Sequence, residues 1–521
     1  MTRAHEKVVI LDFGSQYTQL IARRIREHRV YCEIMPCSAV APGSDLELLL
    51  ASKPSAIVLS GGPSSVYADS APKVDARLFD LGVPVLGICY GLQVMAQALG
   101  GKVECSTSRE YGMTNLKVLK AAGVLSKFAD GEALDVWMSH GDRISVLPPG
   151  FEILAISDNT PYCVVGDHVR KLYGVQFHPE VSHTPRGTDM IASFLFSIAG
   201  ISPTWTPACF VEQAVQDVQI TVGDGHAICG LSGGVDSSVA AVICHQALGD
   251  RLTCVFVDNG LLRLGEFEYV QSVFREHFKM KLVAVNARDR FMSELTGVTD
   301  PELKRKIIGR IFVDVFEEEA RRFSGARFLV QGTIYPDVIE SVATNGPSSK
   351  IKSHHNVGGL PDRMHLSLVE PLRALFKDEV RAAGYALGMP KEFIRRQPFP
   401  GPGLAIRCVG EVTEQRLETL RRADSILDAE IRSASLYESL WQSFCVLLPV
   451  RTVGVMGDER TYDEICAIRA VHSQDGMTAS WAKLPHDLLE RVSNRIVNEV
   501  PGVNRVFYDI TNKPPATIEM E

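Results

Sequence analysis

Short apolar runs alternate with amphipathic stretches along most of the chain, an arrangement typical of βαβ units that build mainly parallel sheets. The alternation occurs in two series. Between them, the segment Gly200–Pro207 contains two prolines among small polar residues, as short linkers do. The length of 521 residues allows about three to four domains. We therefore predict an α/β fold with two doubly wound, mainly parallel sheets.

The expected elements follow from the apolar periods. The first series predicts strands at Val8–Leu11, Ala56–Leu59 and Val83–Ile88. It predicts helices over Tyr17–His28 and from Leu92 on. The second predicts strands at Ala227–Leu231, Leu252–Val257, Lys281–Val285 and Arg327–Val330, and helices over Asp236–Leu248 and Lys304–Phe323. The predicted domains are 1–201, a linker 202–207, 208–402, and a smaller α+β domain 403–521, whose last helix carries an apolar stripe of Leu489, Val492, Ile496 and Val500.

Charge and cysteine usage exclude several classes of protein. A formal net charge of −8 argues against binding to a nucleic-acid polymer or a membrane surface. The N-terminus lacks the apolar core of a signal peptide, and the most apolar window, Val83–Leu99, is interrupted by proline, glycine and glutamine. The twelve cysteines are scattered singly, which predicts reduced thiols, a cytoplasmic location, and neither zinc nor a redox cofactor.

A cysteine lies where an apolar strand is expected to end and a helix to begin, in Gly87-Ile88-Cys89-Tyr90-Gly91. This is the layout of a nucleophile elbow, and a helix N-terminus favours the thiolate. His178 and Glu180, two residues apart at the end of another apolar run, can supply a base and the carboxylate that orients it. By itself, a buried inert cysteine or a His-Pro-Glu turn would be the more ordinary interpretation.

A glycine turn, Ser60–Pro63, follows the expected strand Ala56–Leu59. The backbone N–H groups of Gly62 and Tyr90 are candidates to bind the oxyanion of a tetrahedral intermediate. With its cysteine elbow and His-Pro-Glu, the first part of the chain resembles the class I glutamine amidotransferases. The resemblance implies glutamine hydrolysis by Cys89, His178 and Glu180 through a thioester, with release of ammonia to an acceptor domain.

A second glycine-rich turn opens the second series. It joins the strand Ala227–Leu231 to a helix and combines two glycines that allow close backbone approach with serine hydroxyls and a helix N-terminus, which together make a phosphate cradle: Ser232, Gly233, Gly234, Val235, Asp236, Ser237 and Ser238. It lacks the Gly-Lys-Ser/Thr ending of a Walker A loop. A turn that merely caps the helix is the alternative.

The order of these residues is similar to the PP-loop of the ATP pyrophosphatases. The resemblance implies adenylation of a substrate oxygen with release of pyrophosphate, ATP bound with Mg²⁺, and adenine bordered by the end of the next strand at Val257. Asp337 and Glu340, three residues apart, lie on one face of an expected helix and are candidates to bind magnesium or to position a nucleophile for adenylation. The alternative is that they belong to a solvated helix face without a role in the site. Within an expected loop over Gly346–Pro361, Lys352 is expected to contact phosphate.

The order of the three parts, with the Gln397–Gly403 turn and the terminal Lys513–Glu519 segment, resembles the glutamine-hydrolysing GMP synthase family over essentially the whole chain. The resemblance implies the substrates glutamine, ATP and xanthosine 5′-monophosphate (XMP), and a homodimer formed through the C-terminal domain. It assigns XMP recognition to Arg310, Pro400, Gly401, Pro402, Lys513, Thr517, Ile518 and Glu519. The chain departs from the family at Met520, where tryptophan is expected.

Three other functions compete with this interpretation. Another PP-loop amidating ligase would use a different acceptor, such as the nicotinate-type substrate of NAD synthases, but those enzymes lack the Lys513–Glu519 tail. A tRNA thiolase is opposed by the negative charge and by the lack of paired cysteines at the loop. A glutamine- or nucleotide-sensing regulator would not need the set Cys89, His178 and Glu180.

Overall fold

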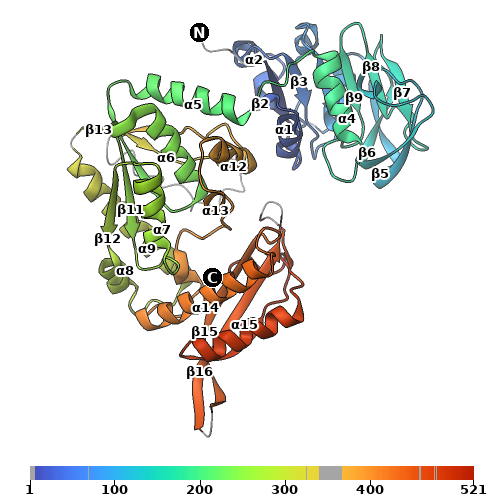
Figure 1. Ribbon diagram of the computed structural model, residues 1–521. Coiled ribbons are helices and arrows are strands. Elements are labelled where there is room, and N and C mark those ends of the chain that lie inside the picture. The colour runs from blue at the N-terminus through green and yellow to red at the C-terminus, as the bar shows by residue number, and fades with distance from the viewer. Residues whose placement is uncertain are drawn as a thin grey trace. The chain divides into compact units, whose positions relative to one another are not determined.

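The computed structural model describes residues 6–68, 70–323, 325–338, 366–456, 459–473, 476 and 478–521 (Figure 1). The chain divides into two compact units, Met1–Cys209 and Phe210–Glu521. The division falls inside helix α5 (Pro207–Val222). Each unit has its own sheet and core, as expected from the two series of apolar runs.

The first unit is built on a nine-stranded sheet with the order β2-β1-β3-β4-β9-β8-β7-β5-β6. Its parallel part comprises β1 (Lys7–Asp12), β2 (Tyr31–Pro36), β3 (Ala56–Leu59), β4 (Val85–Ile88) and β9 (Leu172–Val175). The antiparallel part comprises β5 (Lys102–Val118), β6 (Ala133–Val146), β7 (Glu152–Ile156) and β8 (Val164–Asp167). Helices in this unit are α1 (Thr18–Glu27), α2 (Glu47–Ser52), α3 (Tyr90–Ala98) and α4 (Gly187–Ala192), with a π-helical turn at Ser193–Ile198.

Burial explains why β3 and β4 are continuous apolar runs. Every residue of both strands is buried, because helices and loops cover both faces of the parallel part of the sheet. The two strands carry the turns that follow them to one edge of the sheet, since the carboxyl ends of parallel strands meet there. The predicted thiol and glycine turns therefore start from neighbouring strand ends.

The second unit contains a five-stranded parallel sheet with the order β12-β11-β10-β13-β14. Its strands are β10 (His226–Leu231), β11 (Leu252–Asp258), β12 (Leu282–Asn286), β13 (Ala326–Val330) and β14 (Ser367–Val369). Besides α5, its helices are α6 (Val235–Leu248), α7 (Glu266–Gln271), α8 (Arg288–Leu295), α9 (Pro301–Arg322), α12 (Lys377–Ala386) and α13 (Lys391–Ile394), with a π-helical turn at Ser272–His277. From β10 the chain adds β11 and β12 on one side, and β13 and β14 then lie on the other. The carboxyl end of β10 is therefore a topological switch point, where α/β sheets bind ligands.

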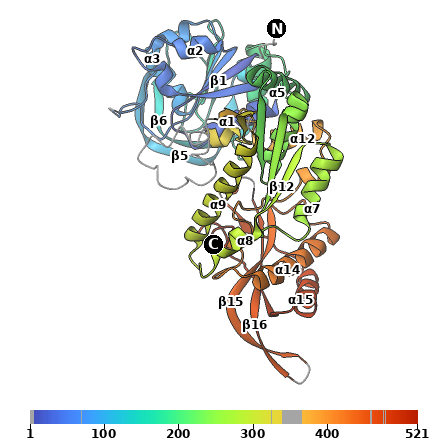
Figure 2. The same ribbon diagram turned by 90° about the vertical axis from the view of Figure 1, so that its left-hand side faces the viewer.

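The C-terminal part packs on this sheet domain. It consists of α14 (Glu414–Ser433), β15 (Gln442–Met456), β16 (Glu459–His472), β17 (Ser480–Trp481), α15 (His486–Glu499) and β18 (Val503–Tyr508) (Figure 2). β15 and β16 form an antiparallel hairpin, and β18 pairs with β16 in parallel. One hydrophobic core joins Ile228 of β10, Ile308 of α9 and Leu417 of α14, so these parts form one packed body.

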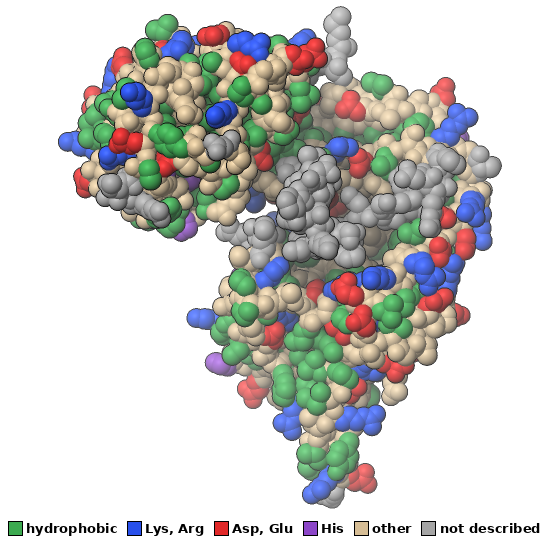
Figure 3. Space-filling view, turned by 180° about the vertical axis from the view of Figure 1, so that it is seen from behind, with side chains coloured by type: hydrophobic (Ala, Val, Ile, Leu, Met, Phe, Trp, Pro, Cys, Tyr) green, Lys and Arg blue, Asp and Glu red, His purple; other side chains and the backbone are tan. Residues whose placement is uncertain are grey.

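Apolar side chains remain exposed along the outer half of the β15–β16 hairpin, where hydrophobic atoms gather near its projecting end (Figure 3). Val453 and Val455 lie two residues apart on one face of β15, and Tyr462 of β16 is directly opposite Val453. Val455 is 74% exposed and Tyr462 60%. We call these three residues the hairpin strip.

The predicted strands and helices of both series are present, with small shifts at their ends. Helix α9 begins three residues before the expected Lys304, because Asp300 caps it and Pro301 occupies its first turn. On the last helix Leu488 is fully buried while Leu489 is partly buried against the same core. The expected loop over Gly346–Pro361 lies outside the described residues. In the part of the chain that the structure describes, no helix is long and apolar enough to cross a membrane.

Candidate active sites

Cys89 occupies a strained turn between β4 and α3. Its φ of 50° and ψ of −106° are unusual for a residue with a side chain. The flanking glycines make this turn possible: a Cβ on Gly87 would lie 2.7 Å from the backbone nitrogen of Leu92, and one on Gly91 only 2.3 Å from the carbonyl oxygen of Leu59. The elbow therefore requires glycine at both positions.

His178 and Glu180 are brought to the thiol by the loop that follows β9. His178 Nδ1 is 2.7 Å from Glu180 Oε1, and the histidine also forms a side-chain hydrogen bond with Cys89. Burial lowers the pKa of His178, but the hydrogen bonds to Cys89 and Glu180 and their negative charges outweigh it and raise the pKa to about 10. The ring is therefore favoured as imidazolium near neutral pH, the state in which it can act as a general acid.

The glycine turn after β3 packs directly on these residues. A Cβ on Gly61 would lie 3.2 Å from His178 Cε1, and one on Gly62 would lie 2.9 Å from the Phe13 carbonyl and 3.2 Å from the Tyr90 ring. Tyr90 is buried, and its hydroxyl donates a 2.6 Å hydrogen bond to the Pro72 carbonyl. The structure thus places Gly61 against the imidazole and Gly62 against the ring of Tyr90, the residue after the thiol.

Three further residues contact this site and were not singled out from the sequence. The ring of Tyr17 stands edge-on to the His178 ring, with centroids 5.0 Å apart. Gln176 Nε2 donates to Cys89 Sγ over 3.8 Å, and the thiol donates to the Ser139 carbonyl over 3.7 Å. Gln176 belongs to the same apolar run as His178, and a polar residue inside such a run is the signal that could have revealed it.

The second glycine turn joins β10 to α6 as a compact loop. Gly233 has a φ of +75°, which favours glycine, and Gly234 is the N-cap of α6. Ser232 and Ser237 share a 3.0 Å hydrogen bond between hydroxyls, and Ser238 Oγ donates to the Gly234 carbonyl over 2.7 Å. Ser232 and Gly234 are exposed, so hydroxyls and backbone of this turn are accessible to a ligand.

Neighbouring strand ends surround this turn. Val257 is buried at the end of β11, which pairs with β10. On the other side, the segment after β13 approaches so closely that a Cβ on Gly332 would lie 2.8 Å from the backbone nitrogen of Ser237. Asp337 follows it and accepts a 3.0 Å hydrogen bond from the Ile334 N–H. Glu340 and Lys352 lie outside the described residues.

Asp236, at the start of α6, has a cationic partner that the sequence did not suggest. Lys377 is the first residue of α12, and its Nζ lies 2.6 Å and 2.5 Å from the two carboxylate oxygens of Asp236. Among the described residues, no group of three or more His, Cys, Asp or Glu could hold a metal. Magnesium on ATP usually needs only one or two protein carboxylates besides phosphate and water, so the single carboxylate of Asp236 fits that ion.

Part of the expected XMP set is anchored firmly in the second unit. The turn at Pro400, Gly401 and Pro402 is closed by a 2.9 Å bond from the Gly403 N–H to the Pro400 carbonyl. Glu519 accepts two hydrogen bonds from Arg407, at 3.0 Å and 2.9 Å.

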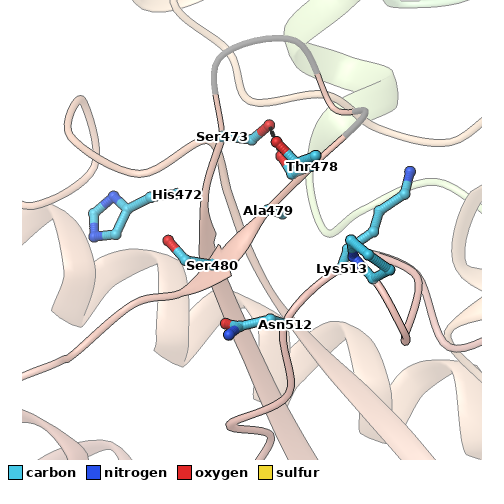
Figure 4. A pocket seen from close by; sticks show the side chains of 8 residues that line it. His472, Ser473, Thr478, Ala479, Ser480, Asn512 and Lys513 are labelled. Atoms are coloured by element: carbon cyan, nitrogen blue, oxygen red, sulfur yellow. Dashed lines mark hydrogen bonds between the residues drawn. The ribbon is translucent and has the colours of Figure 1, made fainter. Parts of the chain in front are cut away.

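The other residues of that set are placed as follows. Ile518 packs against the small core that contains Phe444, and the Thr517 carbonyl accepts from Arg469. Lys513 lines an open pocket of about 610 Å³ beside Ser473, Ser480 and Asn512, and its Nζ donates to the Gly476 carbonyl over 2.7 Å (Figure 4). Arg310 is 54% exposed on α9 and pairs with Glu294 of α8 at 2.9 Å.

Three protein-family models match segments of the chain. Residues 9–198 match the class I glutamine amidotransferase model, residues 208–281 the NAD synthase model, and residues 429–520 the model of the GMP synthase C-terminal domain. The second match covers β10, the glycine turn and α6. The third covers the sheet that carries the hairpin strip.

Curated proteins match over the full length. The glutamine-hydrolysing GMP synthase of Phenylobacterium zucineum is 58% identical over 522 residues, covering 100% of this chain and 99% of its own. The enzymes of the same name from Rhizobium johnstonii and Cereibacter sphaeroides are each 56% identical, and each alignment covers 99% of both chains.

Proposed function

The chain belongs to the glutamine-hydrolysing GMP synthase family, and from that premise we propose which of its residues carry each step. The activity is GMP synthesis with glutamine as the nitrogen donor. ATP adenylates the C2 oxygen of XMP with release of pyrophosphate, and ammonia then displaces AMP. The domain limits we propose are 1–201, 208–402 and 403–521.

Glutamine hydrolysis is assigned to the first unit. The Cys89 thiolate attacks the carboxamide carbon of glutamine, and the N–H groups of Gly62 and Tyr90 stabilise the resulting oxyanion. His178, held by Glu180, gives its proton to the leaving nitrogen, so the C–N bond breaks and ammonia departs. Water, deprotonated by His178, then attacks the thioester carbon and releases glutamate and the thiolate.

Adenylation is assigned to the turn 232–238. Its backbone N–H groups and serine hydroxyls bind the β- and γ-phosphates, and Val257 borders the adenine. The C2 oxygen of XMP attacks the α-phosphorus, and the bond to pyrophosphate breaks. Magnesium bound with ATP offsets phosphate charge; Asp236, Asp337 and Glu340 are its candidate ligands. Lys352 and Lys377 are the candidate cations that contact the phosphates of ATP. Lys377 would do so after exchanging its bond to Asp236 for one to phosphate.

XMP is assigned to the Pro400–Pro402 turn and the terminal segment, Lys513, Thr517, Ile518 and Glu519, with Arg310 as a phosphate contact. Lys513 supports this assignment because its side chain lines an open polar pocket, and a cation there suits a phosphate. Glu519 accepts hydrogen bonds from Arg407 and from Gln442 of β15, and the second bond keeps the terminal segment against β15. In a chain of net charge −8, phosphate recognition depends on a few such cations.

The observation that carries the proposal is a thiol triad, Cys89–His178–Glu180, in one chain with a phosphate turn at a sheet switch point. The test is to incubate the purified chain with XMP, MgATP and either glutamine or ammonium, and to follow GMP and pyrophosphate. We expect both products with either nitrogen source. Pyrophosphate formation that requires nicotinate-type acceptors instead of XMP would favour another amidating ligase.

A homodimer through the C-terminal domain is part of the proposal. The hairpin strip supports it, since Val453, Val455 and Tyr462 expose apolar surface on one face of two paired strands. Val455→Asp should shift sedimentation from dimer to monomer at micromolar concentration. Val169→Asp, at a residue 94% exposed in the first unit, is the control and should leave the mass unchanged. A wild-type chain that sediments only as monomer would contradict the dimer.

We also propose a cytoplasmic location. Cys105 is an exposed free thiol, as expected where thiols stay reduced. Fractionation of cells that produce the chain should place it with cytoplasmic markers. Recovery in a periplasmic fraction would contradict this location.

A further inference from the structure

One guanidinium connects the phosphate turn to the segment that leads into the Pro400–Pro402 turn. Arg396 Nη1 donates a 3.0 Å hydrogen bond to the carbonyl oxygen of Gly233, and Nη2 donates to Glu266 Oε1. Its side chain is 15% exposed and that of Glu266 only 4%. Arg396 lies 163 residues from Gly233 in sequence, so no local pattern indicates the contact.

The bond to Gly233 sets the orientation of the next peptide group. The Gly233–Gly234 bond is a trans peptide, so its C=O and N–H point in opposite directions. Since Arg396 holds the carbonyl on one side, the Gly234 N–H faces the other, where it now donates to Ser232 Oγ over 3.3 Å. Ser232 and Gly234 are both exposed, so this N–H is accessible to a phosphate oxygen.

The position of Arg396 is itself closely determined. Its guanidinium lies over the ring of Phe393, 5.3 Å from the centroid, while the other oxygen of Glu266 accepts a 3.1 Å bond from the Arg263 N–H. Glu266 begins α7, where a carboxylate is favoured by the helix N-terminus. The ion pair is therefore buried with partners for both members, the condition under which a buried pair retains one geometry.

The residue after Arg396 is fixed to the C-terminal sheet. Gln397 Oε1 accepts from the Ser443 N–H over 2.8 Å, and its Nε2 donates to the Tyr437 carbonyl over 3.2 Å. The chain then enters the Pro400–Pro402 turn. Arg396 is thus held from both directions, by Glu266 on the sheet domain and by the anchored Gln397.

We propose that Arg396 is a positioning residue for the adenylation step: it holds the Gly233 carbonyl so that the Gly234 N–H is presented to the pyrophosphate end of ATP. Glu266 holds Arg396 in place. This inference rests on the proposed role of the turn 232–238 in binding ATP. Arg396 does not touch the reacting atoms; it acts through the peptide group that does.

The test compares Arg396→Gln with Arg395→Gln in the full chain. Ammonium replaces glutamine, so that the first unit does not limit the rate. For Arg396→Gln we expect the KM for ATP to rise roughly 10- to 100-fold, the effect of losing a charge-assisted hydrogen bond, while the KM for XMP changes less than about twofold. Arg395 is the matched control: its side chain is 42% exposed and donates to Tyr385 and Glu438, so Arg395→Gln should behave as wild type.

Two milder variants keep the test decisive if Arg396→Gln does not fold. Arg396→Lys retains a cation that can reach one of the two partners and should recover part of the ATP affinity. Glu266→Gln keeps an acceptor but removes the charge, and its KM for ATP should fall between those of wild type and Arg396→Gln. Equal increases in the KM for ATP and XMP, or a lower unfolding midpoint with wild-type kinetics, would overturn the inference.

Ser237→Ala separates this inference from the function on which it rests. If Ser237→Ala leaves the KM for ATP unchanged, the turn does not bind ATP and the role proposed for 232–238 is wrong. If Ser237→Ala raises that KM but the Arg396 variants do not, the turn binds ATP and the positioning role of Arg396 is wrong. The Kd of a non-hydrolysable ATP analogue, measured by fluorescence, should rank wild type and the Arg396 and Glu266 variants in the same order as their KM for ATP.

Discussion

The elbow at Cys89 and the turn 232–238 have the same strand–turn–helix layout, but they differ in whether their functional side chains are already bonded to one another. Both follow a parallel strand, contain glycines, and lead into a helix. At the elbow, the thiol, His178 and Glu180 are buried and already bonded to one another. At the turn 232–238, Ser232 and Gly234 are exposed, and the serines bond mainly within the turn.

The difference reflects the chemistry of each site. Covalent catalysis requires the nucleophile and base to be in place before the substrate arrives, since misplaced groups lose most of the rate. A nucleotide brings its own charge and acceptor oxygens, so a phosphate turn needs mainly backbone donors that are free to face it. Substitutions at the elbow should therefore strongly lower GMP synthesis from glutamine alone. Substitutions at the turn should lower GMP synthesis from both glutamine and ammonium.

The largest expected effect is that of Cys89→Ala. Without the nucleophile no thioester forms, so glutamine-dependent GMP synthesis should fall on the order of 10⁴-fold, while ammonium-dependent synthesis persists. GMP formation with each nitrogen source is the measurement. Cys105→Ala, at an exposed free thiol, is the control and should retain both activities. Loss of both activities in Cys89→Ala would contradict the separation of the two sites.

Asp236→Asn should lower synthesis from glutamine and from ammonium alike, by roughly 100-fold, because the carboxylate lies in the turn and bonds to Lys377. Hydrolysis of glutamine alone should be unchanged. Asp217→Asn on α5, where the exposed side chain accepts from Gln213, is the control. A loss restricted to the glutamine reaction would argue that Asp236 does not serve adenylation.

Adding one methyl group to a glycine should distinguish the two turns. Gly91→Ala would bring its Cβ 2.3 Å from the Leu59 carbonyl, so we expect a loss of about 1–3 kcal/mol in stability and of glutaminase activity. Gly234→Ala has an ordinary φ of −78°, and its Cβ would meet only the Ser232 hydroxyl at 3.3 Å. Its free energy of unfolding should stay within about 0.5 kcal/mol of wild type. Urea unfolding and both activities are measured, and similar damage in the two variants would contradict the comparison.

The smallest effect concerns pH. The pKa of His178 is raised to about 10, so the protonated ring stabilises the fold fully below its ordinary value of 6.5, and that contribution is lost as the pH rises through the folded pKa. Glu180→Gln removes part of this increase. It should cost about 1–2 kcal/mol at pH 6, with a smaller difference from wild type at pH 10.

Urea unfolding at pH 6, 8 and 10 measures that difference. Glu104→Gln provides the control, because Glu104 forms an exposed ion pair with Arg143 in the same unit. A cost of Glu180→Gln that grows with pH would contradict an imidazolium in the folded state.

Local patterns explain which features could be predicted from the sequence. The buried strands β3 and β4 are continuous apolar runs, and the glycines around Cys89 and in 232–238 are needed by turns a few residues long. Such features depend on neighbouring residues, so the fold class and the three families were accessible. The antiparallel hairpin β5–β6 was not predicted, although Leu134, Val136 and Met138 are buried and alternate with more exposed residues along the first half of β6.

Contacts between distant segments could not be read from the sequence. Lys377 reaches Asp236 across 141 residues and Arg396 reaches Gly233 across 163. Lysine and arginine are ordinarily solvated at the surface, so their type alone indicates no partner. Which cation faces which turn depends on how α12 and the segment after α13 pack on the sheet, and that packing is a property of the folded domain.

The ion pair between Lys377 and Asp236 has a calorimetric consequence. Lys377 bonds to Asp236 and Ser232 bonds to Ser237, so the turn satisfies many of its polar groups internally. ATP must exchange these contacts for its own, so the heat released on binding is a difference between two sets of hydrogen bonds. In a calorimetric titration with an ATP analogue, the binding enthalpy of Lys377→Met should therefore be less reduced than the loss of one phosphate contact alone would predict.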